Sequence, residues 1–205
     1  MQDTHAKPFT RYLTEDEEKR LFNHIWQFRA DILARRDWHW MMVLRQTGLR
    51  IGTLARLTVG EARQALREPY RLELRAEACK GGRSYTVRFT RKARRSLRAL
   101  LAVRAEQGHA PLADAPLIMS RNHRPLSVRS YQDRLRKWCL SAGLDAAVSP
   151  HWFRHTLAKR ALERSVSRNP LLVVQQMLGH GSITSTAIYT RPDREEIDEA
   201  FEVAS

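Results

Sequence analysis

The feature that most constrains this chain is the stretch His151–Thr156, which reads HWFRHT and sets an arginine among aromatic residues. His151 and Arg154 are three positions apart, so a helix places them on one face. Pro150 fits the first turn of such a helix, where its missing N–H is not needed. A packed arginine is costly unless an anion meets its guanidinium. The chain is therefore predicted to fold around a helix that presents a cation to an anionic ligand.

A second stretch adds groups that act on phosphate. His180 stands in LGHG, and Tyr189 follows it by nine residues, in a short helix that Ser182 can cap. Histidine exchanges protons near neutral pH, and a tyrosine oxygen can attack phosphorus. Together with Arg154, these residues predict a site that cleaves phosphodiesters with a tyrosine nucleophile.

Charge is unevenly distributed along the chain. The formal net charge is +14. Residues 50–104 hold 15 Lys/Arg against 4 Asp/Glu, a local net of +11, whereas residues 193–205 hold 6 acids and one arginine, a net of −5. A surface that is merely soluble usually mixes the two signs more evenly. The basic body predicts a polyanionic partner, a nucleic acid, and the acidic tail predicts a basic one.

Length and cysteine usage exclude other classes. The 205 residues suffice for one buried domain, and no apolar run approaches the roughly 20 residues of a membrane span. Residues 1–12 lack the apolar stretch of a signal peptide. Cys79 and Cys139 are too far apart in sequence for a metal knuckle. We therefore expect a reducing cytoplasm, no membrane, no metal or other cofactor, and no small-molecule substrate.

The periodicity of the chain predicts a mainly α-helical fold with a small antiparallel β-sheet, an α+β class. Thr14 and Glu17 form a capping-box pattern before apolar residues at helical spacing that continue to Ile32. A second helix is predicted from Asp37 to the stop at Gly48, which leaves Arg50 at a turn between helices.

The central part of the chain predicts a hairpin followed by two basic helices. Residues 72–75 and 85–89 alternate apolar and polar side chains as half-exposed strands do, with Lys80–Arg83 at the tip between them. Residues 91–106 predict a helix capped by Thr90, and Ser127 begins another, from which Arg129, Arg134, Arg136 and Lys137 are expected to project. These basic residues either contact DNA or form a solvated face.

Several of these segments together resemble the tyrosine recombinases of the phage-integrase family. Residues 171–190, LLVVQQMLGHGSITSTAIYT, resemble the family's C-terminal signature, and the HxxR of His151 and Arg154 resembles the box before it. Residues 47–51, TGLRI, resemble the first box, and Lys80 in CKGGR matches the lysine of the small sheet's turn. Four motifs in the order found in the family argue against a chance match. The resemblance covers roughly residues 12–190 and implies the family's catalytic-domain fold.

The resemblance implies a function and a set of roles. The chain is expected to be a site-specific recombinase or integrase that cleaves and rejoins DNA through a 3′-phosphotyrosine, without ATP or metal. The implied catalytic residues are Arg50, Lys80, His151, Arg154, His180 and Tyr189. We expect DNA contacts from Arg83, Arg91, Lys92, Arg129, Arg134 and Lys137. Self-association on DNA as a tetrameric synapse is implied as well, in the setting of a bacterial nucleoid or a mobile element.

Two alternatives stay open. The family commonly has an acidic residue three positions after its first arginine, and Thr53 stands there in this chain. A DNA-binding protein whose catalysis has lapsed is therefore one alternative, and a type IB topoisomerase-like activity is another. His151 and His155 are four apart like the ligands of HExxH, but Trp152 stands where a metalloprotease needs glutamate. His155 is expected to support its helix.

The expected organisation is a flexible lead-in over residues 1–12, a catalytic domain over 13–190 and an acidic C-terminal helix over 191–205. The last of these is expected to dock on a neighbouring protomer or on its own domain. No N-terminal core-binding domain is expected, so the chain is either a short recombinase like the fimbrial-switch inverting enzymes or a fragment of a longer one.

Overall fold

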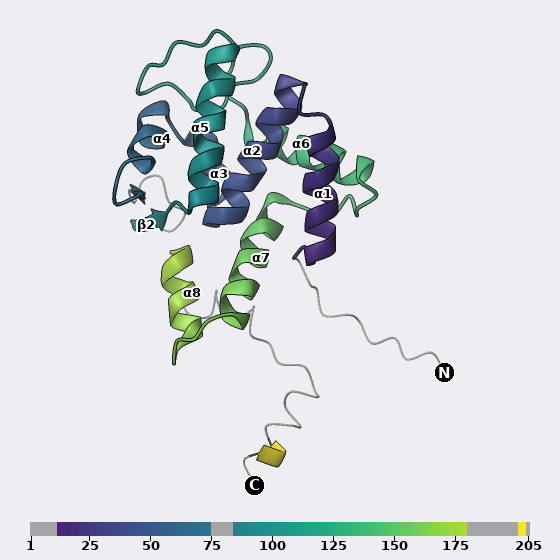
Figure 1. Ribbon diagram of the computed structural model, residues 1–205, viewed down its shortest axis with the longest axis vertical. Helices are drawn as coiled ribbons and strands as arrows, with labels where there is room; N and C mark the ends of the chain where they lie inside the picture. Colours follow the sequence, from purple (N-terminus) through teal and green to yellow (C-terminus); the bar gives the residue numbers. More distant parts are fainter. Residues whose placement is uncertain (1–11, 75–83, 180–200, 204–205) are drawn as a thin grey trace.

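The computed structural model describes residues 12–74, 84–179 and 201–203, and within these ranges it is mostly helical with one small sheet. The helices are α1 (Glu15–Gln27), α2 (Ile32–Thr47), α3 (Ile51–Arg56), α4 (Val59–Ala65), α5 (Arg91–Glu106), α6 (Val128–Ser141), α7 (Pro150–Glu163) and α8 (Pro170–Leu178). The strands are β1 (Arg71–Leu74) and β2 (Tyr85–Arg88). This confirms the predicted fold class. Figure 1 shows α1 to α6 gathered into one body, with α7 and α8 below it.

Side-chain caps explain where several helices begin. Thr14 forms the predicted capping box with Glu17 at the start of α1, and Thr90 caps α5 through the N–H of Ala93. Ser127 caps α6 in the same way. Gly48 ends α2 in the left-handed conformation, with φ +66°, which a residue without a Cβ adopts at little cost. The predicted helix 91–106 agrees with α5 at both ends.

The boundary between the first two helices differs from the prediction. The apolar spacing that runs on to Ile32 predicted one helix through that residue, whereas α1 ends at Gln27 and Phe28 is its exposed C-cap. The next helix, α2, begins five residues before the predicted Asp37. The reason is Asp31, whose carboxylate accepts the N–H groups of Leu33 and Ala34 and so starts the helix there.

The two strands form the predicted hairpin arms. They pair antiparallel in the register Arg71↔Arg88, Leu72↔Val87, Glu73↔Thr86 and Leu74↔Tyr85. Leu72, Leu74 and Val87 are buried while their neighbours along the strands are exposed, as the alternation of apolar and polar residues predicted. The strands that lead to the expected tip are described. The tip itself, Lys80–Arg83, lies outside the described residues.

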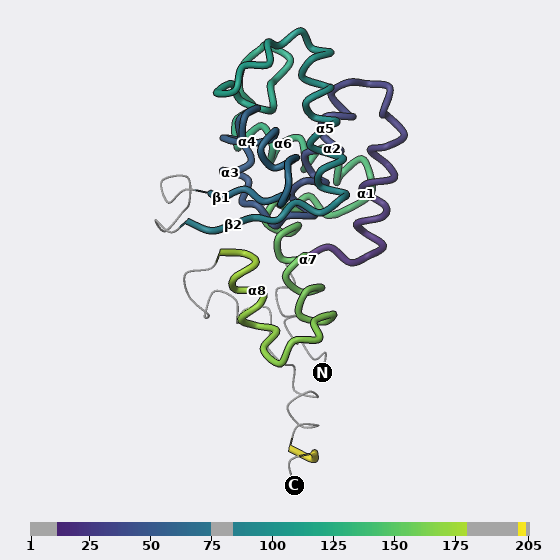
Figure 2. Tube along the Cα trace, turned by 60° about the vertical axis from the view of Figure 1, so that its left-hand side comes forward, coloured from purple at the N-terminus to yellow at the C-terminus, as the bar shows by residue number. Residues whose placement is uncertain are grey.

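The hydrophobic core has two parts. The large part joins α1 to α7 with the sheet and includes Trp40, Tyr131 and Phe153. A separate small cluster of Ala158, Val174 and Leu178 joins α7 to α8. Figure 2 shows α8 beside α7 and next to β2, away from the large body. The helix that carries His151 and Arg154 therefore belongs to both clusters and connects them.

Candidate active site

Arg154 is the centre of the site that the structure describes. It lies on the first turns of α7, only 4 % exposed, between the two hydrophobic clusters. Its Nη1 donates to the backbone carbonyl of Gly48 and its Nη2 to that of Leu178, each at 2.5 Å. The first of these bonds spans 106 residues and the second 24. One side chain thus ties together the ends of α2 and α8.

The position of these two carbonyls explains how a guanidinium is tolerated there. Gly48 is the C-cap of α2, and Leu178 is the last residue of α8. Each helix C-terminus carries the equivalent of about half a negative charge, so two of them offset roughly one positive charge. Arg154 is therefore stabilised by helix ends before any phosphate arrives. A guanidinium has five N–H donors, so it can hold carbonyl oxygens and a phosphate oxygen at the same time.

Arg50 lies on the same segment as Gly48, whose carbonyl accepts a hydrogen bond from Arg154. Arg50 is two residues further along and is the half-buried N-cap of α3. Its Cα lies within about 7.6 Å of that of Gly48, because successive Cα atoms are about 3.8 Å apart. Arg154 thus binds the segment that carries Arg50, although the two residues are distant in sequence. The turn between α2 and α3 that was expected to present Arg50 is present.

Two glycines allow this close packing. A Cβ on Gly48 would lie 2.7 Å from Leu178 Cδ2, and one on Gly179 would lie 2.3 Å from the ring of Tyr85. Gly179 ends α8 with φ +63°, and His180 is the next residue. The end of α8 therefore rests directly on the aromatic ring of β2. This contact fixes the point from which the chain continues toward His180 and Tyr189.

His151 and Arg154 differ in burial although they are three residues apart on α7. His151 is exposed at the second position of the helix, where its imidazole can meet a ligand from solvent. Its ring centroid lies 6.5 Å from that of His155, which is half-buried. Within residues 12–74, 84–179 and 201–203, no three His, Cys, Asp or Glu side chains gather as a metal site. Lys80, His180, Tyr189 and Arg83 lie outside the described residues.

Thr53 occupies the position three after Arg50 and is buried. Its backbone N–H donates to the carbonyl of Arg50 at 2.9 Å, as the first turn of α3 requires. Thr53 therefore belongs to the same helical turn as Arg50. A threonine there contributes no negative charge to the turn, in contrast to the acidic residue that the resemblance led us to expect.

The predicted DNA-contacting residues fall into two groups. Arg91, Lys92, Arg129 and Lys137 are exposed. The first two stand in the first turn of α5, which contains no acid, although a helix N-terminus favours negative charge. The partial positive charge of the helix N-terminus disfavours cations at this position, so binding of an external anion would stabilise them. Arg129 makes a surface contact of 3.7 Å with Asp133, a type of pair that contributes little to stability.

Arg134 corrects one expectation. It was predicted to project from α6 toward DNA, whereas its Nε donates to a carboxylate oxygen of Asp37, which is completely buried. Its side chain is 31 % exposed. The buried Asp37 attracts the guanidinium inward because an isolated carboxylate in the core is costly. Arg134 is therefore mainly the ion-pair partner of the buried Asp37, and only the outer part of its guanidinium faces solvent.

The contacts between α7 and the residues at the start of α1 were not predicted from the sequence. The N–H of Leu13 donates to Thr156 Oγ1 at 2.9 Å, and Lys159 Nζ lies 3.0 Å from Tyr12 Oη. Arg160 pairs with the buried Glu18, which also binds Arg45 of α2. The start of α1 is thus fastened along α7. The signal was weak, because a threonine and a lysine on a helix are usually solvated.

Comparison with known proteins agrees with this geometry. The profile of the phage integrase family matches residues 11–196, and the chain belongs to this family. Among curated relatives, the tyrosine recombinase XerC of Shewanella sp. (strain W3-18-1) is 31 % identical over 200 residues, which are 97 % of this chain and 61 % of the relative. The XerC of Proteus mirabilis is 32 % identical over 174 residues, 85 % of this chain and 53 % of the relative. The chain thus spans little more than half the length of these relatives.

Solved structures show the same fold at lower sequence identity. The XerH site-specific recombinase bound to difH substrate, in a pre-cleavage complex, has a TM-score of 0.72 and 20 % identity, over 100 % of this chain and 57 % of that one. The XerA recombinase has a TM-score of 0.68 and 22 % identity, over 100 % and 66 %. The Tn1549 transposon integrase with circular intermediate DNA has a TM-score of 0.70 and 18 % identity, over 100 % and 70 %. The chain therefore has the fold of these recombinases.

Proposed function

We propose that this protein is a tyrosine-type site-specific recombinase that cleaves and rejoins double-stranded DNA through a 3′-phosphotyrosine. The observation that carries the proposal is that Arg154 binds the carbonyl of Gly48, two residues before Arg50, in a chain of the phage integrase family. Two fixed cations suit the negative charge that gathers on the non-bridging oxygens of the transition state. The curated relatives are named tyrosine recombinases, and solved structures of similar fold are complexes with DNA.

In this proposal each residue has a role. The Tyr189 oxygen attacks phosphorus, forms the phosphotyrosine bond and displaces the 5′ oxygen of the next nucleotide. Ionising a phenol of pKa about 10 at pH 7 costs roughly 4 kcal/mol, so His151 or His180 assists by accepting the proton or binding the phosphate. Lys80 gives a proton to the leaving 5′ oxygen. The phosphotyrosine keeps the bond energy, so religation by a 5′ hydroxyl releases the tyrosine without ATP.

A further part of the proposal concerns DNA and assembly. Arg83, Arg91, Lys92, Arg129 and Lys137 contribute phosphate contacts, which add affinity but little sequence preference. Arg134 contributes only through the outer part of its guanidinium. Residues 13–190 act as the catalytic domain, and the acidic segment 191–205 docks on a neighbouring protomer in a tetrameric synapse. The site of action is the cytoplasm, at the nucleoid or on a mobile element.

None of the helices in the described ranges combines the length and apolar character that crossing a membrane requires.

The second candidate is a DNA-binding protein on the same scaffold without cleavage, and Thr53 is the observation that favours it. An uncharged residue in the turn of Arg50 provides no carboxylate to orient that guanidinium. A topoisomerase-like relaxation of DNA without partner exchange uses the same covalent step and differs only in whether two duplexes exchange strands.

Trapping of the covalent intermediate tests the proposal. A nicked suicide substrate releases the 5′ fragment and leaves the protein attached to DNA. Wild-type protein should form the adduct, and Tyr189→Phe should bind DNA with nearly unchanged affinity while forming none, because only the attacking oxygen is lost. An adduct at wild-type yield with Tyr189→Phe contradicts the nucleophile assignment. Binding without any adduct from the wild type identifies the lapsed scaffold, and relaxation of plasmids without recombinants identifies the topoisomerase-like activity.

A further inference from the structure

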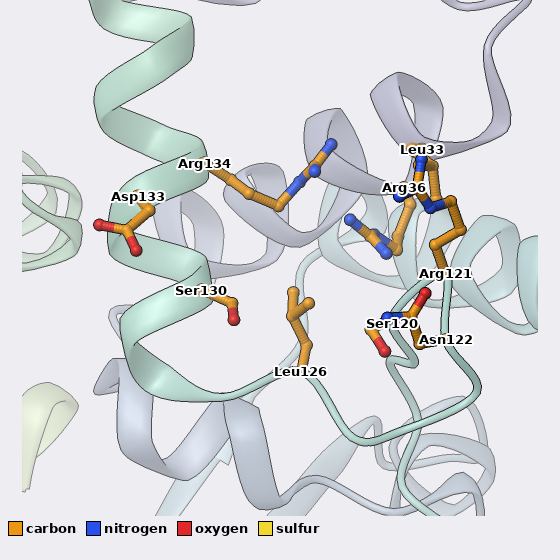
Figure 3. A pocket seen from close by; sticks show the side chains of 9 residues that line it. All are labelled: Leu33, Arg36, Ser120, Arg121, Asn122, Leu126, Ser130, Asp133 and Arg134. Carbon is orange, nitrogen blue, oxygen red and sulfur yellow. The ribbon is translucent and has the colours of Figure 1, made fainter.

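A cavity of about 420 Å³ lies between the start of α2, the start of α6 and the loop before α6. Three arginines line it, namely Arg36, Arg121 and Arg134. Figure 3 shows their side chains on one side of the cavity, while Ser130 and Leu126 point into it and the carboxylate of Asp133 points away. Ser120 and Asn122 add further polar groups at the loop. The lining is therefore rich in donors and in positive charge.

The charge beneath this cavity is not balanced by the protein around it. Asp37 is 0 % exposed, and its oxygens accept from Arg36, Arg134, Trp40 and Trp138. Arg36 is 2 % exposed and also donates through Nη1 to the carbonyl of Met119 at 2.7 Å. Two guanidinium groups thus share one carboxylate, which leaves a net charge of +1 at the base of the cavity. A buried excess charge is stabilised when an opposite charge approaches it.

The outer donors face the cavity. Across the described part of the chain, Arg134 bonds only through Nε, and the exposed Arg121 makes no hydrogen bond or ion pair. Ser120 Oγ accepts the N–H of Arg124, which leaves its hydroxyl proton to donate. Arginine forks with serine and asparagine side chains are the set that contacts phosphate groups in protein–DNA interfaces.

The cavity is separate from the site around Arg154. Arg36 and Gly48 lie at opposite ends of α2, twelve residues apart, which is roughly 18 Å at about 1.5 Å per residue. One phosphate cannot contact both. Duplex DNA carries a phosphate about every 3.4 Å of axis on each strand, so a bound duplex has other phosphates at distances of this order.

We propose that this cavity, formed by Arg36, Arg121 and Arg134 over Asp37, is a second phosphate site that receives a single backbone phosphate of the bound DNA. A compact ligand is usually enclosed over most of its surface, whereas this cavity is wide and open to solvent, which suits a phosphate still attached to a duplex. Arg124, in the same loop before α6, is exposed and adds a further positive charge to that loop. The site anchors DNA and takes no part in the chemistry. It rests on the proposed binding of DNA and does not depend on cleavage.

Salt dependence of binding to a short duplex tests this site. Each phosphate contact contributes a slope of about −0.9 to the plot of log K against log salt concentration. Arg121→Ala should reduce the magnitude of the slope by about one such contact, and so should Arg134→Gln, whose amide can still reach Asp37. Since both residues serve one phosphate, the double variant should lose the same single contact. Arg20→Ala, a matched loss of an exposed arginine on α1, should leave the slope unchanged.

Other outcomes overturn the proposal. An unchanged slope in Arg121→Ala excludes the site, and an equal change in Arg20→Ala reduces the effect to overall charge. Additive losses in the double variant assign the two arginines to different phosphates. A rise in melting temperature with inorganic phosphate that is lost in Arg121→Ala, while the DNA slope stays constant, identifies a site for free phosphate instead. Arg121→Glu, which places a negative charge at the same exposed position, should weaken DNA binding further, and a melting temperature equal to that of the wild type shows that the loss is not a loss of folding. The salt slope is read from binding alone, and Tyr189→Phe should leave it unchanged, which separates this test from that of covalent cleavage.

Discussion

At the scale of single residues, Arg154 has a structural and a chemical task at the same time. Its bonds to the carbonyls of Gly48 and Leu178 hold the ends of α2 and α8 together, and the same guanidinium is proposed to meet the scissile phosphate. Substitution of Arg154 therefore changes both folding and cleavage. The two effects are easier to separate at Gly48, which supplies one of the carbonyls and touches no DNA in the proposed reaction.

Gly48→Ala should destabilise the protein and slow cleavage. The left-handed backbone costs a residue with a Cβ about 1–2 kcal/mol, and the contact of 2.7 Å with Leu178 Cδ2 adds about 1–3 kcal/mol of overpacking. Gly143→Ala is the matched control, since Gly143 has φ +68° and nothing within 4 Å of its added Cβ. Urea denaturation should show only the first cost for Gly143→Ala, with normal adduct formation. Equal losses for the two variants would mean that the close contact with Leu178 adds no cost of its own.

His39 gives the fold a dependence on acid. Burial, with a smaller contribution from the charge of Arg35, lowers the pKa of His39 from 6.5 to about 4. The folded state therefore favours the neutral imidazole, and its contribution to stability is complete above pH 6.5 and is lost as the pH falls toward 4. The loss amounts to about 3 kcal/mol. Urea denaturation across this range should show the decline, and His39→Gln should flatten it. A decline of the same size in the variant would assign the effect to other groups.

At the scale of elements, the sequence predicted what short-range chemistry determines. The cap at Thr90, the capping box at Thr14, the strand alternation and the stop at Gly48 all depend on neighbouring residues, and the structure has each of them. The start of the second helix was predicted wrongly. Asp31 caps a helix that begins at Ile32, five residues before the predicted Asp37, and a capping residue does not show in the spacing of apolar residues. The family boxes predicted Arg50 and Arg154 as catalytic residues, which stays a prediction; the structure shows that Arg154 binds the carbonyl of Gly48, two residues before Arg50.

What the sequence could not predict depends on contacts between distant elements. The inward turn of Arg134 is caused by Asp37, which is 97 residues away, and a basic residue on an amphipathic helix otherwise suggests solvent. The fastening of Leu13 to Thr156 spans 143 residues. The partners of Arg154 are backbone carbonyls, which every residue has, so the residue types do not reveal them. These contacts decide which charged residues are available to DNA.

The joint between α2 and α6 should depend strongly on Asp37. Asp37→Asn removes the charge that Arg36 and Arg134 share and leaves a guanidinium that is 2 % exposed without a counterion. Removal of one partner from a buried ion pair costs about 3–5 kcal/mol. The control is Asp133→Asn, which removes an equal charge from an exposed pair on α6 and should cost about 0.5 kcal/mol or less. The free energy of unfolding in urea measures both, and similar values would show that the buried pair contributes no more than a surface one.

At the scale of the whole molecule, we propose that the acidic tail and the basic body both serve assembly. The structure describes Phe201 and Val203 at the end of the chain as 71 % and 89 % exposed. Apolar side chains in a short helix that is marginal on its own favour docking on another surface. The opposite charges of the tail and of residues 50–104 attract each other at moderate salt. This distribution supports the proposal that residues 191–205 join protomers.

Deletion of residues 193–205 should spare binding to a single DNA site and impair assembly on paired sites, because the body keeps its phosphate contacts and loses only the docking segment. Gel shift on single sites, beside native mass on paired sites, measures the two effects. Phe201→Ala should reproduce part of the defect by removing the apolar contact, while Glu202→Gln, which changes charge on the neighbouring residue, should have a smaller effect. Formation of four-protomer complexes by the truncated protein, with normal recombination, would show that protomers couple through another surface. A truncated protein that forms adducts but no paired complexes would place the tail in assembly and not in the cleavage step.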